Sequence, residues 1–348
     1  MQLLKAMNDY GHEQIVYARD DKVGLSAIIA VHSTVLGPAL GGTRFFNYTT
    51  EDDALYDVLR LSRGMTLKNA AAGLKLGGGK AVIIGDPNKL KSQEFFSSYG
   101  KFIESLGGKY YTAEDVNVNA SDVAKMNKTT KYLTGTGSPE ASGDPSPFTA
   151  RGVYMGIKAG ANIKFGSDSL AGKTVVVQGI GNVGYALCRL LHNDGAKLKV
   201  YDINVDSLTK AVSEFGAIAI SADEVMQSNC DIFAPCAMGA VLNTNNVSNL
   251  NCAIVAGAAN NILVDAETAD KLEKRDILYL PDYIINAGGV INCGVEIADG
   301  VYDVGKVNDR ITGIYDTTMK ILALAKEKGI TTYRAADEYA EGIIKAAR

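Results

Sequence analysis

The stretch Thr174-Val175-Val176-Val177-Gln178-Gly179-Ile180-Gly181-Asn182-Val183-Gly184 decides the fold of this chain. Its apolar half is typical of a strand buried on both faces of a parallel sheet. Its second half matches GxGxxG, which becomes informative when it joins a strand to a helix. We expect Gly179 to allow a tight turn, Gly181 to admit a pyrophosphate, and Gly184 to let helix and strand pack. The motif predicts that residues 179–184 bind a dinucleotide at a helix N-terminus.

An acidic residue follows the motif at the spacing that dinucleotide folds use. Asp202 ends the next predicted strand, where a carboxylate accepts hydrogen bonds from the adenosine ribose. It would repel the extra phosphate of NADP, and the neighbours Ile203 and Asn204 supply no arginine to bind that phosphate. The sequence therefore predicts NAD as the cofactor. The alternative is a tight turn that binds nothing.

Strands and helices alternate on both sides of this motif. Further strands are predicted at residues 198–201, 231–234, 253–256 and 277–280, so this part reads as a doubly wound parallel sheet. Upstream, strands are predicted at 26–31 and 81–84, and a helix begins at Thr50, where Asp53 completes a capping box. Helices are also predicted at 149–164, 307–328 and 332–347. The pattern indicates an α/β protein.

Length and composition limit the possible classes of protein. The chain has 348 residues, which favours about two domains, and residues 134–147 form the clearest loop and a hinge candidate. A net charge of -4 argues against nucleic-acid or anionic-membrane partners. Five cysteines without CxxC spacing indicate free thiols in a reducing compartment. With no signal peptide or apolar span apparent, we expect a cytoplasmic protein.

Acid–base chemistry is assigned to lysine or a carboxylate. The three histidines form no metal-binding spacing, so no metal site is predicted. Residues 64–85 lack acids almost entirely, are rich in alanine and glycine, and contain Lys68 and Lys80. A lysine beside a second cation is pushed toward its neutral, basic form. The alternative is that both are ordinary surface lysines.

Two other features of this region are weaker on their own. Gly-Gly-Gly-Lys at 77–80 is not a phosphate-binding P-loop, because Leu74 and Ala81 stand where that pattern needs glycine and Ser or Thr. Asp115 follows a probable strand, where an acid is often only a cap for the next turn.

Several blocks together resemble the glutamate/leucine/phenylalanine/valine dehydrogenase family over nearly the whole chain, most closely its leucine-oxidising members. The blocks are Leu36-Gly37-Pro38-Ala39-Leu40-Gly41-Gly42-Thr43-Arg44, residues 68–80, Ala113-Glu114-Asp115-Val116, Gly257-Ala258-Ala259-Asn260-Asn261 and Pro281-Asp282-Tyr283-Ile284-Ile285-Asn286-Ala287-Gly288-Gly289.

The resemblance implies reversible, NAD-dependent oxidative deamination of branched-chain L-amino acids to 2-oxo acids and ammonia. Lys80 is then the catalytic base, Asp115 exchanges protons with the amino group, and Lys68 holds the substrate carboxylate. Three residues besides the glycine turn and Asp202 contribute to the cofactor site: Ala258, Asn260 and Asn286. The implied substrate pocket comprises Leu40, Gly41, Gly42, Met65, Ala113, Val290 and Cys293.

The pocket residues limit the choice of substrate. Members that take glutamate carry a lysine near the Leu40 position, so an apolar side chain is implied. Cys293 stands where leucine-oxidising members carry valine, which leaves leucine, valine, isoleucine and phenylalanine open. Two alternatives remain: an aromatic amino-acid dehydrogenase of the same family, and a catalytically silent NAD-binding regulatory protein.

The resemblance also implies a domain plan. Residues 1–135 would form a substrate-binding and oligomerisation domain, to which the tail 330–348 returns. Residues 136–329 would form a Rossmann NAD-binding domain, with the chemistry in a cleft between the two. The family implies a homo-oligomer, from a dimer to an octamer.

Overall fold

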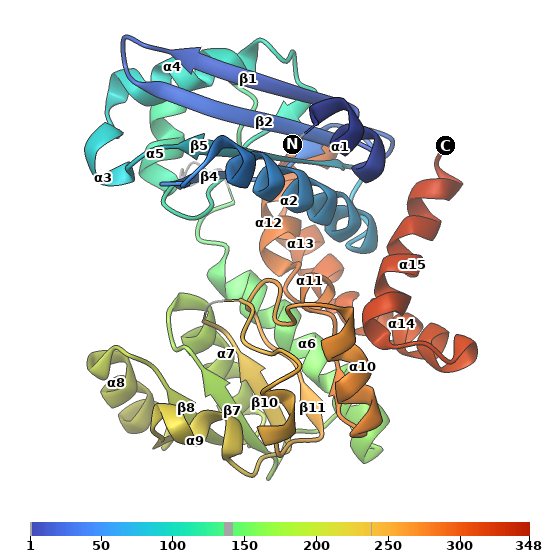
Figure 1. Cartoon of the computed structure of the whole chain (residues 1–348). Helices are drawn as coiled ribbons and strands as arrows, with labels where there is room; N and C mark the ends of the chain where they lie inside the picture. Colours follow the sequence, from blue (N-terminus) through green and yellow to red (C-terminus); the bar gives the residue numbers. More distant parts are fainter. Residues whose placement is uncertain (1, 136–141, 238) are drawn as a thin grey trace. The chain divides into compact units, whose positions relative to one another are not determined.

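The computed structural model describes residues 2–135, 142–237 and 239–348, which form two compact units (Figure 1). Unit 1 comprises Met1–Asp144, Ile291–Lys306 and Ala340–Arg348; unit 2 comprises Pro145–Val290 and Val307–Tyr339. The predicted boundaries differ in three places, the first being that unit 1 continues to Asp144 instead of ending at residue 135. Residues 291–306 cluster with unit 1, where Gly294 packs against Leu74 and Leu76, and only the last part of the tail does so.

Unit 1 is built on a mixed sheet. Its strands run in the order β1-β2-β5-β3-β6, and β4 also pairs with β5. The two pairings of β2 are antiparallel, and the pairings among β3, β4, β5 and β6 are parallel. The strands are β1 (Gln14–Asp20), β2 (Leu25–Ser33), β3 (Ala39–Leu40), β4 (Thr43–Phe46), β5 (Gly77–Ile84) and β6 (Tyr110–Tyr111). Strands at 26–31 and 81–84 are confirmed, whereas the edge strand β1 was not predicted.

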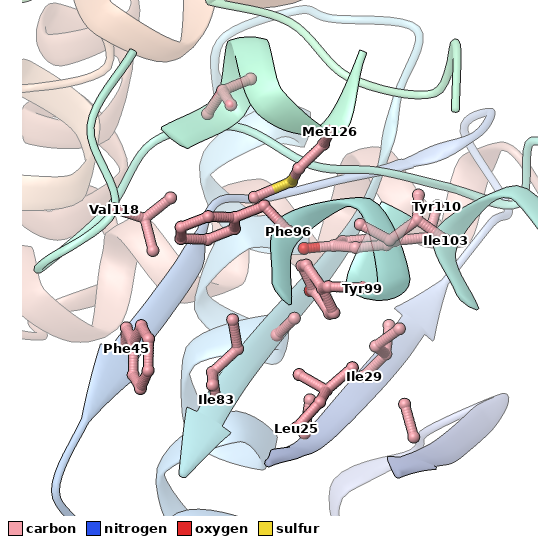
Figure 2. Close-up of a cluster of buried hydrophobic side chains, with 14 of the residues drawn as sticks. Leu25, Ile29, Phe45, Ile83, Phe96, Tyr99, Ile103, Tyr110, Val118 and Met126 are labelled. Atoms are coloured by element: carbon pink, nitrogen blue, oxygen red, sulfur yellow. The ribbon is translucent and has the colours of Figure 1, made fainter. Parts of the chain in front are cut away.

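Alternating side chains place helices on opposite faces of this sheet. Ile28, Ala30 and Val82 pack with helix α2 (Glu51–Ala71). Ile29, Ile83 and their neighbours face the aromatic side chains of α4 (Gln93–Glu104), as Figure 2 shows. Successive residues of a strand point to opposite faces of the sheet, so both sets of side chains are buried where helices cover both faces. The remaining helices of this region are α1 (Leu3–Tyr10), α3 (Pro87–Leu90) and α5 (Ala120–Met126).

The start of α2 confirms the prediction made from the capping box. The Thr50 hydroxyl accepts from the Asp53 amide at 3.1 Å, and the Asp53 carboxylate accepts from the Thr50 amide at 3.1 Å. Two amide donors that the helix itself leaves unpaired are thereby satisfied. The cap fixes where α2 begins, and therefore which α2 residues lie against the sheet.

Unit 2 is a Rossmann-type fold. Its strand order is β12-β11-β10-β7-β8-β9 and every pairing is parallel. The order reverses between β7 and β10, which is the switch point where such sheets bind dinucleotides. The strands are β7 (Thr174–Gln178), β8 (Lys197–Tyr201), β9 (Ile218–Ala219), β10 (Ile232–Pro235), β11 (Ile254–Val255) and β12 (Leu278–Tyr279). The predicted doubly wound sheet is confirmed.

The helices correct one prediction. The predicted helix 307–328 is two helices, which separate at Gly313. Most of the predicted loop 134–147 falls on residues 136–141, outside the described residues. The helices are α6 (Ser146–Phe165), α7 (Asn182–Asn193), α8 (Val205–Phe215), α9 (Ala222–Gln227), α10 (Ala266–Lys274), α11 (Asp282–Ile285), α12 (Gly288–Asp299), α13 (Val304–Thr312), α14 (Ile314–Lys328) and α15 (Thr332–Ala346). No helix in the described part of the chain could cross a bilayer.

Two histidines pack together between β2 and α2: His12 is buried and His32 is half-buried. The rings of His12 and His32 lie 4.8 Å apart in an edge-on arrangement. His12 Nε2 lies 2.7 Å from the Ser62 hydroxyl oxygen, while His12 Nδ1 is buried without a hydrogen-bond partner. Burial, followed by repulsion from His32, lowers the pKa of His12 to about 4. Protonation in the folded state is therefore unfavourable.

This pair predicts acid lability. The pKa of His12 in the folded protein is below its ordinary value of 6.5. The neutral ring therefore contributes fully to the stability of the fold above pH 6.5, and this stability is lost as the pH falls toward 4. We expect a loss of about 3 kcal/mol in unfolding free energy from this residue between pH 7 and pH 4. Urea unfolding of the wild type and His12→Gln at both pH values tests this. An equal acid loss in the variant would contradict it.

Candidate functional site

Lys80 is a buried lysine in the middle of the unit 1 sheet. Its side chain is 8% exposed, and its residue lies on β5 opposite Ala30 of β2. Lys80 shares strand parity with Val82, which packs against α2, so its side chain is directed to the α2 face. A buried lysine needs a partner for its charge. The surface-lysine alternative therefore does not describe Lys80.

The partner is Asp115. Its Oδ2 lies 2.8 Å from Lys80 Nζ. A tight turn holds the aspartate, with Asp115 and Val118 exchanging backbone hydrogen bonds around Asn117, which has φ 58°. Burial acts to raise the pKa of Asp115, but attraction to Lys80 and Arg44 outweighs it, so the pKa lies below its ordinary value. This direction favours an ionised Asp115 beside Lys80.

Arg44 is the residue of this cluster that was not predicted. Its Nε contacts Asp115 Oδ2 at 3.2 Å, and its Nη1 contacts Asp57 Oδ2 at 2.9 Å. Asp57 also accepts from Tyr48 at 2.7 Å and from Arg60 at 2.9 Å. The available signal was the alternation in β4: Thr43 and Phe45 are buried, which directs Arg44 to the other face.

The double glycine at 41–42 allows backbone segments to pack closely in this region. A Cβ at Gly41 would lie 1.9 Å from the Gly79 carbonyl oxygen, and one at Gly42 would lie 2.2 Å from that of Glu114. Any larger residue would displace β5 or the segment that carries Asp115. The same Cβ at Gly41 would lie 3.1 Å from the side chain of Met65. Gly41, which is followed directly by Gly42, thus lies close to Met65, and the close backbone contacts alone require the two glycines.

The other predicted substrate residues have different surroundings. Leu40 is fully buried on β3, and the Ala113 carbonyl accepts from the Thr43 amide at 3.0 Å. Lys68 lies in the last turn of α2, two residues after Thr66, whose backbone packs against Gly78 of β5. Lys68 is half-buried. The chain therefore carries Lys68 and Lys80 on two elements that pack against each other.

Cys293 is placed in unit 1 and Val290 in unit 2. The Ser142 hydroxyl lies 3.6 Å from Cys293 Sγ, and the Thr134 hydroxyl donates to the Cys293 carbonyl at 3.2 Å. Burial raises the pKa of the thiol to about 11, so it stays protonated and behaves as a small apolar group. All five cysteines are free thiols.

Each glycine of the turn in unit 2 has a separate role. Gly179 has φ 91°, which favours glycine, and a Cβ there would lie 2.6 Å from Ala237. A Cβ at Gly184 would lie 1.9 Å from the Gly179 carbonyl oxygen, so this glycine lets α7 pack on the turn. Gly181 faces open space and is the N-cap of α7, with no side-chain cap. Uncapped amide donors facing open space fit a phosphate group.

Asp202 lies beside this turn. Its Oδ2 accepts from the Ile180 amide at 2.6 Å, and its Oδ1 accepts from the Asn204 amide at 2.8 Å. Each carboxylate oxygen has a further lone pair for a ribose hydroxyl. The structure therefore gives Asp202 a role in shaping the turn that the sequence did not reveal.

Polar groups also follow the carboxyl ends of the parallel strands of unit 2. The Asn286 amide group donates to the Asn260 side chain at 3.0 Å and to the Ala258 carbonyl at 3.1 Å. Asn286 Oδ1 and Gln178 Oε1 are buried oxygens without hydrogen-bond partners. Buried unpaired acceptors are costly, so each fits an amide or hydroxyl donor of a bound ligand.

Comparisons with known proteins cover the whole chain. The model for "Glu/Leu/Phe/Val dehydrogenase, dimerisation domain" matches residues 12–132, and that for "Glutamate/Leucine/Phenylalanine/Valine dehydrogenase" matches 142–203 and 198–347. Leucine dehydrogenase of Bacillus subtilis (strain 168) is 49% identical over 350 residues, covering 100% of this chain and 95% of that protein. Valine dehydrogenase of Streptomyces virginiae is 44% identical over 343 residues, covering 97% and 95%.

A solved structure has the same fold along its whole length. The crystal structure of L-tryptophan dehydrogenase from Nostoc punctiforme aligns with a TM-score of 0.86 and 42% sequence identity. The alignment covers 99% of each chain.

Proposed function

Because this chain belongs to the glutamate/leucine/phenylalanine/valine dehydrogenase family, we propose that it catalyses the reversible NAD-dependent oxidative deamination of branched-chain L-amino acids. The products are 2-oxo acids, ammonia and NADH. The chain is an amino-acid dehydrogenase and hence an oxidoreductase with a Rossmann-type domain. The observation that carries the proposed mechanism is the buried contact between Lys80 and Asp115 at 2.8 Å.

The roles of the residues follow from the chemistry of deamination. Lys68 binds the substrate carboxylate, and Asp115 exchanges a proton with the substrate amino group. A bound nicotinamide supplies the acceptor for the hydride that leaves the α-carbon, which leaves an iminium on the substrate. Lys80 in its neutral form then takes a proton from the water that attacks this carbon. Asp115 gives a proton to the nitrogen of the adduct, the carbon–nitrogen bond breaks as the hydroxyl proton leaves to solvent, and ammonia and the 2-oxo acid are released. Lys80 then returns its proton to solvent.

The residues of unit 2 fit a dinucleotide. The α7 N-terminus and Gly181 would take the pyrophosphate, and Asp202 would take the adenosine ribose. Asn286 and Asn260, with the unpaired Asn286 oxygen, would hold the carboxamide of the nicotinamide. The proposed preference for NAD rests on the negative charge of Asp202.

Removing the Asp202 charge tests the cofactor preference. Asp202→Asn keeps an acceptor oxygen for the turn but removes the charge that repels the NADP phosphate. We expect the ratio of kcat/KM for NAD to that for NADP to fall about tenfold or more. Steady-state kinetics with both cofactors measure the ratio, and a melting temperature shows whether the turn survives. A folded variant with an unchanged ratio would remove Asp202 from cofactor selection.

Lys68 is expected to act mainly in binding. Lys68→Ala should raise the KM of the amino acid about 10- to 100-fold, because a charge-assisted contact with the carboxylate is lost. The KM of NAD should change little. Some loss of kcat is expected if the contact also orients the substrate. Lys68→Arg keeps the charge and should recover part of the effect, whereas an unaltered amino-acid KM in Lys68→Ala would contradict the role.

A panel of amino acids with NAD and NADP tests the proposed reaction. We expect NADH formation with leucine, valine and isoleucine, since buried Leu40 offers no cation to an acidic side chain. The similarity to L-tryptophan dehydrogenase supports phenylalanine and tryptophan as the alternative substrates. A clear aromatic preference would favour that alternative. Dinucleotide binding without turnover of any amino acid would favour a silent regulatory protein.

We also propose that the enzyme works in the cytoplasm as a homo-oligomer. The name of the family domain that matches residues 12–132 supports assembly through this part of the chain. Light scattering coupled to size-exclusion chromatography would give the number of subunits, and a monomer at working concentration would contradict the proposal.

A further inference from the structure

The side chain of Arg44 is a permanent cation in contact with the proposed catalytic carboxylate of Asp115. Arg44 Nε and Lys80 Nζ both contact Asp115 Oδ2, at 3.2 and 2.8 Å. The side chains of Arg44 and Asp115 are 22% and 19% exposed, so water screens this contact only partly. One oxygen of the carboxylate is therefore held by two positive charges from neighbouring strands.

Arg44 is itself held from the α2 side. Asp57 Oδ2 accepts from Arg44 Nη1 at 2.9 Å and from the Tyr48 hydroxyl at 2.7 Å, while Arg60 contacts the other Asp57 oxygen at 2.9 Å. A guanidinium with carboxylates on two of its nitrogens keeps its plane and position. Arg44 therefore connects the α2 carboxylate to Asp115 in a fixed geometry.

The two cations on Asp115 differ in chemistry. Lys80 must lose its proton to activate water, and at that moment its charge no longer holds Asp115 as an anion. A guanidinium keeps its proton throughout the working range of a protein. Arg44 would therefore keep Asp115 ionised while Lys80 is neutral. Without Arg44, the proton released by Lys80 would move more readily onto Asp115.

We propose that Arg44 is a positioning residue that holds the charge and orientation of Asp115 and thereby sets the lower pH limit of activity. This inference rests on the roles proposed above for Lys80 and Asp115. In the described part of the chain, the charged and titratable groups around Asp115 include Lys80 from β5, Arg44 from β4, Asp57 from α2, and the phenols of Tyr48 and Tyr110. Burial raises the pKa of both phenols above its ordinary value, so they stay neutral. The balance at Asp115 is therefore decided by Lys80, Arg44 and Asp57.

The pH dependence of kcat/KM separates positioning from a merely structural role. In Arg44→Gln the acidic limb of the curve of kcat/KM against pH should move to higher pH by about one to three units. Loss of a cation favours the protonated state of every titratable group beside it. In Asp57→Asn the limb should move to lower pH, because the charge of Arg44 is then less neutralised. Arg44→Lys restores the charge with fewer contacts, so the limb should return toward the wild-type position while kcat stays reduced.

Arg60→Gln is the matched control. It removes an arginine that contacts Asp57 on the oxygen away from Arg44. The limb should move much less than in Arg44→Gln. An Arg44→Gln enzyme with reduced kcat but an unmoved acidic limb would overturn the proposal, and so would equal shifts in the Arg44 and Arg60 variants.

A titration without turnover separates this inference from the proposed reaction. The carboxyl carbon of Asp115 can be followed by 13C NMR against pH in the wild type, in Arg44→Gln and in Arg44→Lys. Its midpoint should rise in the glutamine variant and stay near the wild-type value in the lysine variant. An unchanged midpoint in a folded Arg44→Gln protein overturns the inference even if amino acids are turned over. A raised midpoint supports it even if they are not.

Discussion

We expect Lys80→Ala to lower kcat about a thousandfold or more, because the variant has no amine to take a proton from the attacking water. Binding of NADH, measured by fluorescence titration, should survive, since the dinucleotide motif lies in unit 2. The substitution also opens a space next to Asp115, which remains paired with Arg44. Small primary amines added to the assay should therefore recover part of the lost rate.

Lys75→Ala provides the matched control for Lys80. Lys75 lies in the same glycine-rich stretch but is exposed. We expect near wild-type kcat in this variant. If Lys80→Ala kept its turnover, or fell only as far as Lys75→Ala, Lys80 would have no part in the mechanism. Lys80→Met, which keeps most of the side-chain volume, distinguishes loss of the amine from loss of packing.

Asp115→Asn should lower both kcat and the unfolding free energy. The amide keeps the shape of the carboxylate but cannot accept a proton from the substrate, so kcat should fall about 100- to 10,000-fold. Lys80 and Arg44 also lose the anion that they share at Asp115 Oδ2. This loss should reduce the unfolding free energy by about 3 kcal/mol. Urea unfolding and steady-state kinetics at one pH measure both effects.

Asp122→Asn separates the two effects. Asp122 is another buried aspartate of unit 1 that holds two cations, Lys91 at 2.5 Å and Lys125 at 2.9 Å. Its replacement should destabilise the protein with little effect on kcat. An Asp115→Asn enzyme that loses stability but keeps its turnover would reduce Asp115 to the structural role of Asp122.

Local patterns in the chain predicted most of the elements that form the site. The strand at 174–178 and the glycine turn after it are readable because strand period, glycine spacing and helix start fall within 11 consecutive residues. The N-terminus of α2 is readable because a capping box needs only Thr50 and Asp53. By contrast, the break at Gly313 was missed because helical spacing continues across it.

Residues that meet through sheet pairing were harder to predict. Lys80 and Asp115 were singled out partly because of the family resemblance, but nothing near Arg44 in the chain shows that it reaches Asp115, 71 residues away. Asp57 could not be linked to Arg44 either, because β4 must first pair with β5 and α2 must pack on the sheet face to which Arg44 is directed. The return of residues 291–306 to unit 1 also depends on contacts with Leu74 and Leu76 that no local pattern encodes.

By itself, the sequence predicted the doubly wound sheet and the dinucleotide turn, because periodicity and glycine placement act over short distances, whereas the roles of Lys80 and Asp115 were implied by the family resemblance. Only the tertiary structure decided which charges share Asp115. Strand register brings Thr43–Phe46 beside Ala81–Ile84, and side-chain alternation then directs Lys80 and Arg44 to the face that α2 covers. Electrostatic pairing depends on distances of a few ångströms, and such distances exist only after the sheet has formed.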